Sequence, residues 1–255
     1  MLITSTKNET VKRLRRLKER AARRETGLHL IEGERLVFDA VNSEIRPETI
    51  IIEDGRDDLK ERIAELGLSY TLVSRQVLEA ICDTPSPQGI CASVYTPDTT
   101  PPDSYLSGMI VALDALQDPG NLGTILRTAD AMGAVGLLLG EGCTDVYSPK
   151  AMRAAMGSTY HLPIYRGELR KELLRLREQG YKLVCGHLKG EERIPEVGPC
   201  CVIVIGNEGN GVSDDISELC ELCRLPMYGR AESLNASVAA SILIYELAKR
   251  MRVGV

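Results

Sequence analysis

The sequence has 255 residues, of which 44% are hydrophobic and 26% are charged. These proportions are typical of a globular protein with one large domain or two ordinary ones, and they exclude a chain that is disordered throughout. No stretch reaches the roughly 18 apolar residues that a membrane span needs. The first residues also lack the apolar core of a signal peptide. We therefore expect a cytoplasmic protein that does not enter a membrane.

The first predicted element is a basic helix over Asn8–Arg24. Its apolar residues recur at spacings of three and four, as on one face of a helix: Val11, Leu14, Leu17 and Ala21. Between Lys7 and Arg24 there are nine basic and two acidic residues, a net charge of +7, whereas the whole chain is −5 and the remainder therefore −12. Such a concentrated charge favours contact with a polyanion. The alternative is a solvated helix face.

The elements that follow predict a small α/β unit. A short apolar segment, Leu28–Gly33, precedes a helix at Glu34–Asn42. Three segments are typical of strands with helices between them: Thr49–Ile52, Tyr70–Val73 and Ile90–Val94. The prolines of Thr96–Asp103 cannot continue a helix or a central strand. We therefore predict a first domain at 1–95 and a linker at 96–107.

The pattern of strands and helices in the remaining residues, 108–255, predicts a second α/β domain. Its strands are almost continuous apolar runs that alternate with helices: Met109–Leu113, Gly136–Leu139, Lys182–Cys185 and Cys201–Ile205. Runs of this kind are typical of a parallel sheet that helices cover on both faces. Ligands of such sheets bind beyond the carboxyl ends of the strands.

Three polar segments lie at predicted strand ends. In the first, Asp114–Arg127, Asp118 and Asn121 are candidate helix caps, and Arg127 falls opposite the apolar face of the helix. By itself Arg127 is better explained as a surface arginine. The second, Gly206–Val212, places the carboxylate of Glu208 in a glycine-rich turn.

The glycine spacing of the second segment matches neither the dinucleotide fingerprint nor a P-loop, which disfavours NAD and ATP. The third segment begins as a short strand at Leu225 and continues into a helix with Ser233 or Asn235 near its start. Without the other two segments, this segment is equally well explained as a well-capped helix.

The aromatic and cysteine contents narrow the possible chemistry. With no Trp and one Phe, the chain has few residues for a base-stacking platform of several aromatics. The eight cysteines are expected to be reduced and mostly buried. Cys220-x-x-Cys223 lacks a second pair of compatible geometry, because Cys200 and Cys201 are adjacent in a strand and point to opposite faces. We predict no metal.

Taken in order, the three segments resemble the motifs of the SpoU (TrmH) RNA ribose methyltransferases of the SPOUT superfamily. The matching residues are Asn121, Gly123 and Arg127, then Gly206–Gly209 with Gly211, then Pro226–Met227 and Ser233–Ala239. Residues Ile3–Val94 are similar to the family's N-terminal substrate-binding domain, whose fold resembles an RNA-binding ribosomal protein. A phosphate-loop metabolic enzyme is disfavoured. A non-catalytic RNA-binding or assembly factor stays an alternative.

The resemblance implies a knotted C-terminal domain, S-adenosylmethionine as cofactor and a homodimer. It implies transfer of a methyl group to a ribose 2′-hydroxyl, with ribosomal RNA expected before transfer RNA. The implied catalytic residues are Arg127, Asn121, Glu208, Ser233 and Asn235. The cofactor would be held near Gly206, Leu225, Met227 and Leu234. RNA phosphates would be bound by the basic residues Lys12, Arg13, Arg15, Arg16, Arg20, Arg23 and Arg24.

Overall fold

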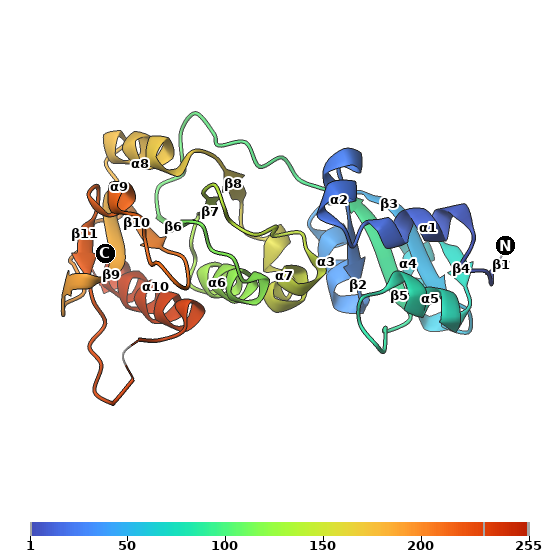
Figure 1. Cartoon of the computed structure of the whole chain (residues 1–255). Helices are drawn as coiled ribbons and strands as arrows, with labels where there is room; N and C mark the ends of the chain where they lie inside the picture. Colours follow the sequence, from blue (N-terminus) through green and yellow to red (C-terminus); the bar gives the residue numbers. More distant parts are fainter. Residues whose placement is uncertain (1, 232, 254–255) are drawn as a thin grey trace. The chain divides into compact units, whose positions relative to one another are not determined.

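The computed structural model describes residues 2–231 and 233–253. By its internal contacts the chain divides into two compact units. The first contains the residues up to Pro97 together with Tyr147–Arg153, and the second contains Asp98–Val146 and the residues from Ala154 on. Each unit is built on its own β-sheet (Figure 1).

The sheet of the first unit is mixed and has the strand order β1-β4-β3-β5-β2. Strands β1, β4 and β3 are parallel, whereas β5 runs antiparallel to both β3 and β2. The elements are β1 (Leu2–Ile3), α1 (Glu9–Arg16), α2 (Arg20–Thr26), β2 (Leu28–Glu32), α3 (Glu34–Asn42), β3 (Pro47–Glu53), α4 (Asp57–Glu65), β4 (Thr71–Val73), α5 (Arg75–Ile81) and β5 (Ile90–Tyr95). The predicted small α/β unit is confirmed.

Helix α1 is held by its apolar face. Val11 and Leu14, with Leu17 just after the helix, are almost completely buried in a cluster that includes Val77 and Leu78 of α5. Burying one such side chain contributes about 1.5–3 kcal/mol. The opposite face of α1 is thereby left to its basic residues.

The prediction of one continuous helix over Asn8–Arg24 was wrong, because the chain breaks between α1 and α2. Glu19 is extended, with ψ 135°. The Arg23 guanidinium donates to the carbonyl oxygens of Leu17 and Lys18, both at 2.7 Å. These carbonyls are thereby satisfied without further helical turns.

The sheet of the second unit is parallel throughout, with the order β11-β9-β10-β6-β7-β8. The elements after the linker are β6 (Met109–Leu113), α6 (Pro119–Ala131), β7 (Gly136–Leu139), α7 (Pro149–Ala155), η1 (Ser158–Tyr160), β8 (Ile164–Arg166), α8 (Leu169–Glu178), β9 (Lys182–Glu191), β10 (Cys201–Ile205), α9 (Asp214–Ser217), β11 (Glu221–Cys223) and α10 (Ala236–Val253). Every residue of β6, β7 and β10 is buried, as the continuous apolar runs predict.

One predicted strand was displaced. The strand expected to begin at Leu225 lies earlier, as β11, and Leu225 follows it in an irregular segment. Pro226 explains this, because proline has no N–H to donate to a sheet. In Figure 1 residues 224–231 leave the sheet after β11 as an irregular segment.

Helix α10 packs against α6 and against strands β9 and β10. The hydroxyl groups of Thr128 on α6 and Ser241 on α10 are 3.0 Å apart. Small residues such as Ser237 and Ala240 on α10 are buried. They permit this close approach of the two helices, which lie side by side in Figure 1.

In the described chain, no helix is long and apolar enough to cross a membrane. The eight cysteines are free thiols. Burial raises the pKa of Cys220 to about 12 and that of Cys223 to about 11. Both thiols are therefore protonated near neutral pH. No group of three His, Cys, Asp or Glu residues within 2–231 and 233–253 has the arrangement of a metal site.

Candidate active site

The three polar segments leave the second sheet at the carboxyl ends of its strands. Strands β6 and β10 are neighbours in register, with Leu113 opposite Ile205. The next residue, Asp114, donates its backbone N–H to the Ile205 carbonyl at 2.8 Å. The first and second segments therefore begin side by side, at the edge where parallel sheets bind ligands.

Glu208 joins these two segments. Its carboxylate accepts hydrogen bonds from the backbone N–H groups of Gln117 (3.1 Å) and Asp118 (2.9 Å), and from Nδ2 of Asn121 (3.0 Å). Burial raises the pKa of Glu208, but these donors outweigh it and hold the pKa below its ordinary value of 4.5. Glu208 is therefore an ionised clamp between the loops.

Asn121 also connects Glu208 to the third segment. Its Oδ1 accepts from Nδ2 of Asn235 at 3.1 Å. The Oδ1 of Asn235 in turn accepts from Ser237 N (2.9 Å), Ser237 Oγ (2.7 Å) and Val238 N (3.3 Å). Asn235 thus caps the start of α10. We call the line Glu208–Asn121–Asn235 the carboxylate–amide relay.

The beginning of α6 is fixed by a second cap. The Asp118 carboxylate accepts from the backbone N–H of Asn121 at 2.8 Å, and Pro119 occupies the first turn of the helix, as is common there. This cap fixes the backbone of Asn121, while Glu208 and Asn235 hold its amide. Both candidate caps of the first segment therefore have a partner, but only Asp118 caps α6.

Two further contacts shape the site and were not predicted from the sequence. Asn207 Nδ2 donates to the carbonyl of Ala115 at 2.9 Å, and its Oδ1 accepts from the N–H of Gly209 at 2.9 Å. Asp114 accepts from the N–H and hydroxyl of Ser213 at 2.8 and 2.7 Å. Ala115 has a left-handed φ of 51°, an unusual conformation for a residue with a side chain. The sequence of a polar segment alone does not reveal which of its side chains will form hydrogen bonds to the backbone and hold its conformation.

Gly206 makes the turn after β10 possible. A Cβ atom placed on it would lie 2.1 Å from the backbone carbon of Gly211. Asn207 and Gly211 are joined by two backbone hydrogen bonds across this turn, at 2.9 and 3.0 Å. Any residue larger than glycine at 206 would open the turn that carries Glu208.

Arg127 and Ser233 lie outside the relay. Both are exposed, and among the described residues neither side chain has a hydrogen bond or an ion pair. Arg127 lies on α6, away from its buried residues Leu126 and Ala129. The relay therefore brings together three of the five candidate catalytic residues and leaves two with free polar groups.

The third segment also carries three of the four candidate cofactor residues. Leu225 and Met227 are half-buried, and Leu234 is exposed. In the described part of the chain, no backbone–backbone hydrogen bond uses residues 225–231. A segment with apolar side chains and unused backbone N–H and C=O groups suits an adenosine-containing cofactor, which needs both kinds of contact.

In the first unit, the basic residues fall into three groups. Lys12, Arg13 and Arg16 form ion pairs with Glu9 (2.7 Å), Glu48 (2.6 Å) and Glu25 (3.0 Å). Three arginines are exposed and form no ion pair among the described residues: Arg15, Arg20 and Arg24. Arg23 is only 6% exposed. Because the Arg23 guanidinium is buried and donates to backbone carbonyl groups, the prediction that Arg23 contacts RNA phosphate is corrected.

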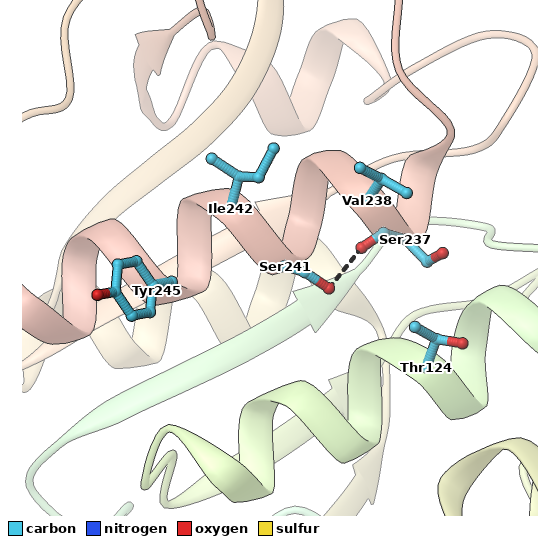
Figure 2. A pocket seen from close by; sticks show the side chains of 6 residues that line it. All are labelled: Thr124, Ser237, Val238, Ser241, Ile242 and Tyr245. Carbon is cyan, nitrogen blue, oxygen red and sulfur yellow. Dashed lines mark hydrogen bonds between the residues drawn. The ribbon is translucent and has the colours of Figure 1, made fainter.

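An apolar groove lies between α6 and α10 (Figure 2). Its volume is about 320 Å³, and its lining residues are Thr124, Ser237, Val238, Ser241, Ile242 and Tyr245. Val238, Ile242 and Tyr245 are 47%, 40% and 54% exposed. They follow one another along one face of α10 (Figure 2), a pattern that marks an interaction surface.

Comparison with known proteins identifies the family. Residues 108–245 match the SpoU rRNA Methylase family, and residues 8–92 match the MRM3-like substrate binding domain. The chain is 36% identical to the 23S rRNA (guanosine(2553)-2′-O)-methyltransferase RlmP of Bacillus subtilis over 251 residues, covering 96% of this chain and 98% of that relative.

Solved structures agree with the sequence comparison. An AdoMet-bound rRNA methyltransferase from Sinorhizobium meliloti is 32% identical, with a TM-score of 0.87, and the match covers 98% of this chain and 97% of that one. The SpoU methyltransferase AviRb from Streptomyces viridochromogenes is 27% identical, with a TM-score of 0.86 and coverage of 97% and 99%. The chain belongs to the SpoU rRNA Methylase family and is an RNA 2′-O-ribose methyltransferase.

Proposed function

We propose that this protein methylates a ribose 2′-hydroxyl of ribosomal RNA. The observation that carries the proposal is the carboxylate–amide relay, which gathers the three motif segments at one edge of the sheet. Ribosomal RNA is favoured over transfer RNA because full-length relatives such as RlmP and the Sinorhizobium meliloti enzyme are named for rRNA. Some relatives carry a broader tRNA/rRNA name, so transfer RNA is the alternative to be tested.

S-adenosylmethionine is the methyl donor. When bound, it supplies an electrophilic methyl group to the ribose oxygen. We place it against the turn at Gly206 and the segment with Leu225, Met227 and Leu234. The unused backbone groups of residues 225–231 support this placement, because they leave hydrogen-bond donors and acceptors for an adenosine.

We assign Arg127 the role of stabilising the attacking oxygen or orienting a neighbouring phosphate. A guanidinium stays protonated at neutral pH, so it is a donor of hydrogen bonds and a poor proton acceptor. Its lack of a partner among the described residues leaves those donors available to RNA. Developing negative charge on the 2′-oxygen is what such a group stabilises best.

Glu208 and Ser233 receive different roles. Glu208 is an ionised clamp that already accepts three hydrogen bonds, so we assign it to holding the loops rather than to taking the ribose proton. The exposed hydroxyl of Ser233, which has no described partner, is free to bind substrate. Asn121 and Asn235 then keep the first and third segments at a fixed separation.

We further propose that the protein is a homodimer through the groove of Figure 2. Thr124 lines the groove, and Arg127 lies three residues further along α6, on the same side of the helix. A second copy packed on Val238, Ile242 and Tyr245 would therefore border the Arg127 guanidinium. The catalytic arginine would then lie beside the dimer interface.

The two predicted domains receive separate tasks. Residues 1–95 bind RNA, 96–107 connect, and 108–255 perform the methyl transfer. Arg15, Arg20 and Arg24 are ready to bind phosphates, and the exposed ion pairs of Lys12 and Arg16 are weak enough for phosphate to replace the carboxylate. Arg13 is held more firmly, because it donates two hydrogen bonds to Glu48, whose side chain is only 21% exposed. We assign the protein to the cytoplasm, where its RNA substrate would be found. The knot that the family resemblance implies for the C-terminal domain stays a prediction.

The test is a substrate comparison. Unmodified rRNA and tRNA transcripts are each incubated with the protein and labelled S-adenosylmethionine, beside the Arg127→Ala variant as a matched control. The proposal expects label in rRNA with the wild-type protein and little with the variant. Label in tRNA alone would transfer the proposal to that substrate. Cofactor binding without transfer to either RNA would favour a non-catalytic RNA-binding factor.

A further inference from the structure

Tyr228 is the most exposed large hydrophobic side chain among the described residues, at 95%. Its ring has no aromatic contact and its hydroxyl no hydrogen bond within the described chain. The chain has only nine tyrosines and one phenylalanine. A fully exposed ring leaves both of its apolar faces in water and available to a partner.

The neighbours of Tyr228 suit a nucleotide. Gly229, next to Tyr228, is exposed, and a Cβ atom added to it would meet nothing within 4 Å, so the backbone beside the tyrosine is open to a ligand. Arg230 is exposed and has no ion pair among the described residues. An aromatic ring with a free cation two residues away offers one surface for a base and one for its phosphate.

The position of Tyr228 links it to the reaction. It follows Met227 directly, in the segment that we assign to the cofactor. The same segment ends at Asn235, which the relay fastens to Asn121 at 3.1 Å. A base stacked on Tyr228 would therefore lie beside the segment that we assign to the cofactor.

We propose that Tyr228 stacks on an unpaired base of the RNA substrate next to the methylated ribose, and that Arg230 binds a phosphate of the same stretch. The inference rests on the proposed function. Proteins that recognise single-stranded RNA commonly stack splayed bases on aromatic rings. A second copy of the chain is the less suitable occupant of this loop, because the apolar side chains that a copy would bury lie on α10.

The experiment uses the absence of tryptophan from the chain. Tyr228→Trp creates a single fluorescent reporter, and Leu106→Trp, at an exposed apolar side chain of the linker and outside the RNA-binding first unit, is the matched control. Each variant is titrated with the RNA transcript that the wild-type protein methylates, and separately with inorganic polyphosphate. The proposal expects RNA to quench the indole emission of Tyr228→Trp saturably and polyphosphate to leave it unchanged. The emission of Leu106→Trp should respond to neither.

Methyl-transfer kinetics provide the second readout. Tyr228→Phe keeps the ring, so its KM for RNA stays near that of the wild type, whereas Tyr228→Ala raises KM between about fivefold and about a hundredfold. The affinity for S-adenosylmethionine is expected to be the same in both variants. Arg230→Gln weakens RNA binding and reduces its dependence on salt.

Three results would overturn the proposal. One is an emission of Tyr228→Trp that RNA does not change while the wild-type protein methylates that RNA. Another is an unchanged KM in Tyr228→Ala. A third is emission that depends on protein concentration and not on RNA, because the ring would then be covered by a second copy. If the wild-type protein methylates no RNA, both the inference and the proposed function fail.

Discussion

The side-chain amide of Asn121 donates to the Glu208 carboxylate at 3.0 Å, and this contact fixes the direction of the whole relay. Because its nitrogen is used by Glu208, its oxygen must face Asn235, whose own oxygen then faces the N–H groups at the start of α10. The positive end of a helix of 18 residues is thereby joined to an ionised carboxylate through two aligned amides. Only a side chain that is both donor and acceptor can occupy position 121.

The first prediction concerns Asn121→Asp. Two carboxylates would then face each other at a distance where both cannot easily be ionised, so one pKa rises strongly. We expect methyl transfer at neutral pH to fall at least about tenfold, because the loops separate. The rate should recover as the pH is lowered and the pair takes up one proton. The rate–pH profile of the variant, measured beside the wild-type profile, provides the test.

The control for this prediction is the double variant Asn121→Asp with Glu208→Gln. It restores one donor and one carboxylate, although one of the backbone N–H groups at 117 and 118 loses its acceptor. The double variant should therefore be more active at neutral pH than Asn121→Asp, without its recovery in acid. Equal activity of the two variants at every pH would contradict the relay.

A second prediction follows from the lowered pKa of Glu208. Because the folded protein favours the ionised form, Glu208 contributes stability that is fully present above its ordinary pKa of 4.5 and is lost as the pH falls through the lower folded value. The melting temperature of the wild type should exceed that of Glu208→Gln at pH 6–8, and the difference should shrink in acid. A difference that grows in acid would show that the carboxylate is not ionised in the folded protein.

The third prediction concerns Arg127. Removing the guanidinium in Arg127→Ala should lower kcat about 10²–10³-fold, the loss typical of one donor to a developing oxyanion. Arg127→Lys keeps the charge and should retain part of the activity. Isothermal titration should give the same S-adenosylmethionine affinity for all three proteins. Wild-type rates in Arg127→Ala would remove this residue from the mechanism.

The basic helices allow a fourth prediction, since their arginines differ in burial. Changing Arg15, Arg20 and Arg24 together to Gln should weaken RNA binding and reduce the slope of log K against log salt by about two to three, or about 0.7–0.9 for each lost phosphate contact. Arg23→Gln should instead leave RNA binding unchanged and lower the free energy of unfolding by about 1.5–3 kcal/mol, because buried carbonyls lose a charged donor. Filter binding and urea unfolding distinguish the two effects.

The fifth prediction tests the groove between α6 and α10. Ile242→Glu places a charge in the centre of the proposed dimer interface and should produce monomers in sedimentation experiments at micromolar concentration. Leu106→Glu, at an apolar and more exposed position outside the groove (67% exposed, against 40% for Ile242), is the control and should leave the oligomeric state unchanged. A monomeric wild-type protein, or a dimer that tolerates the charge at 242, would place the interface elsewhere.

The sequence predicted the buried strands well because an apolar run such as Val202–Ile205 can bury all of its side chains in a strand that is covered on both faces. It failed where a single side chain outweighed periodicity. The spacing of Val11, Leu14 and Leu17 continues smoothly past the break that Arg23 stabilises. Strand β11 has only three residues, too few for a pattern, and was therefore misplaced.

The same limit applies to the candidate site. The motif resemblance named Asn121, Glu208 and Asn235, but their hydrogen-bond order depends on how three distant segments meet, which no local pattern contains. Asp114 and Ser213 are separated by 99 positions and were missed for that reason. Arg23 carries the same charge as its exposed neighbours, so the sequence could not show that Arg23 is buried.

The most direct measurement is the position of the transferred methyl group. Unmodified rRNA is incubated with the protein and deuterated S-adenosylmethionine and digested to nucleosides, and the labelled product is identified by mass spectrometry. The account predicts label on the ribose, so that fragmentation leaves the base unlabelled and the neighbouring phosphodiester resists alkali. Label on a base, or none in rRNA that the protein binds together with the cofactor, would contradict it.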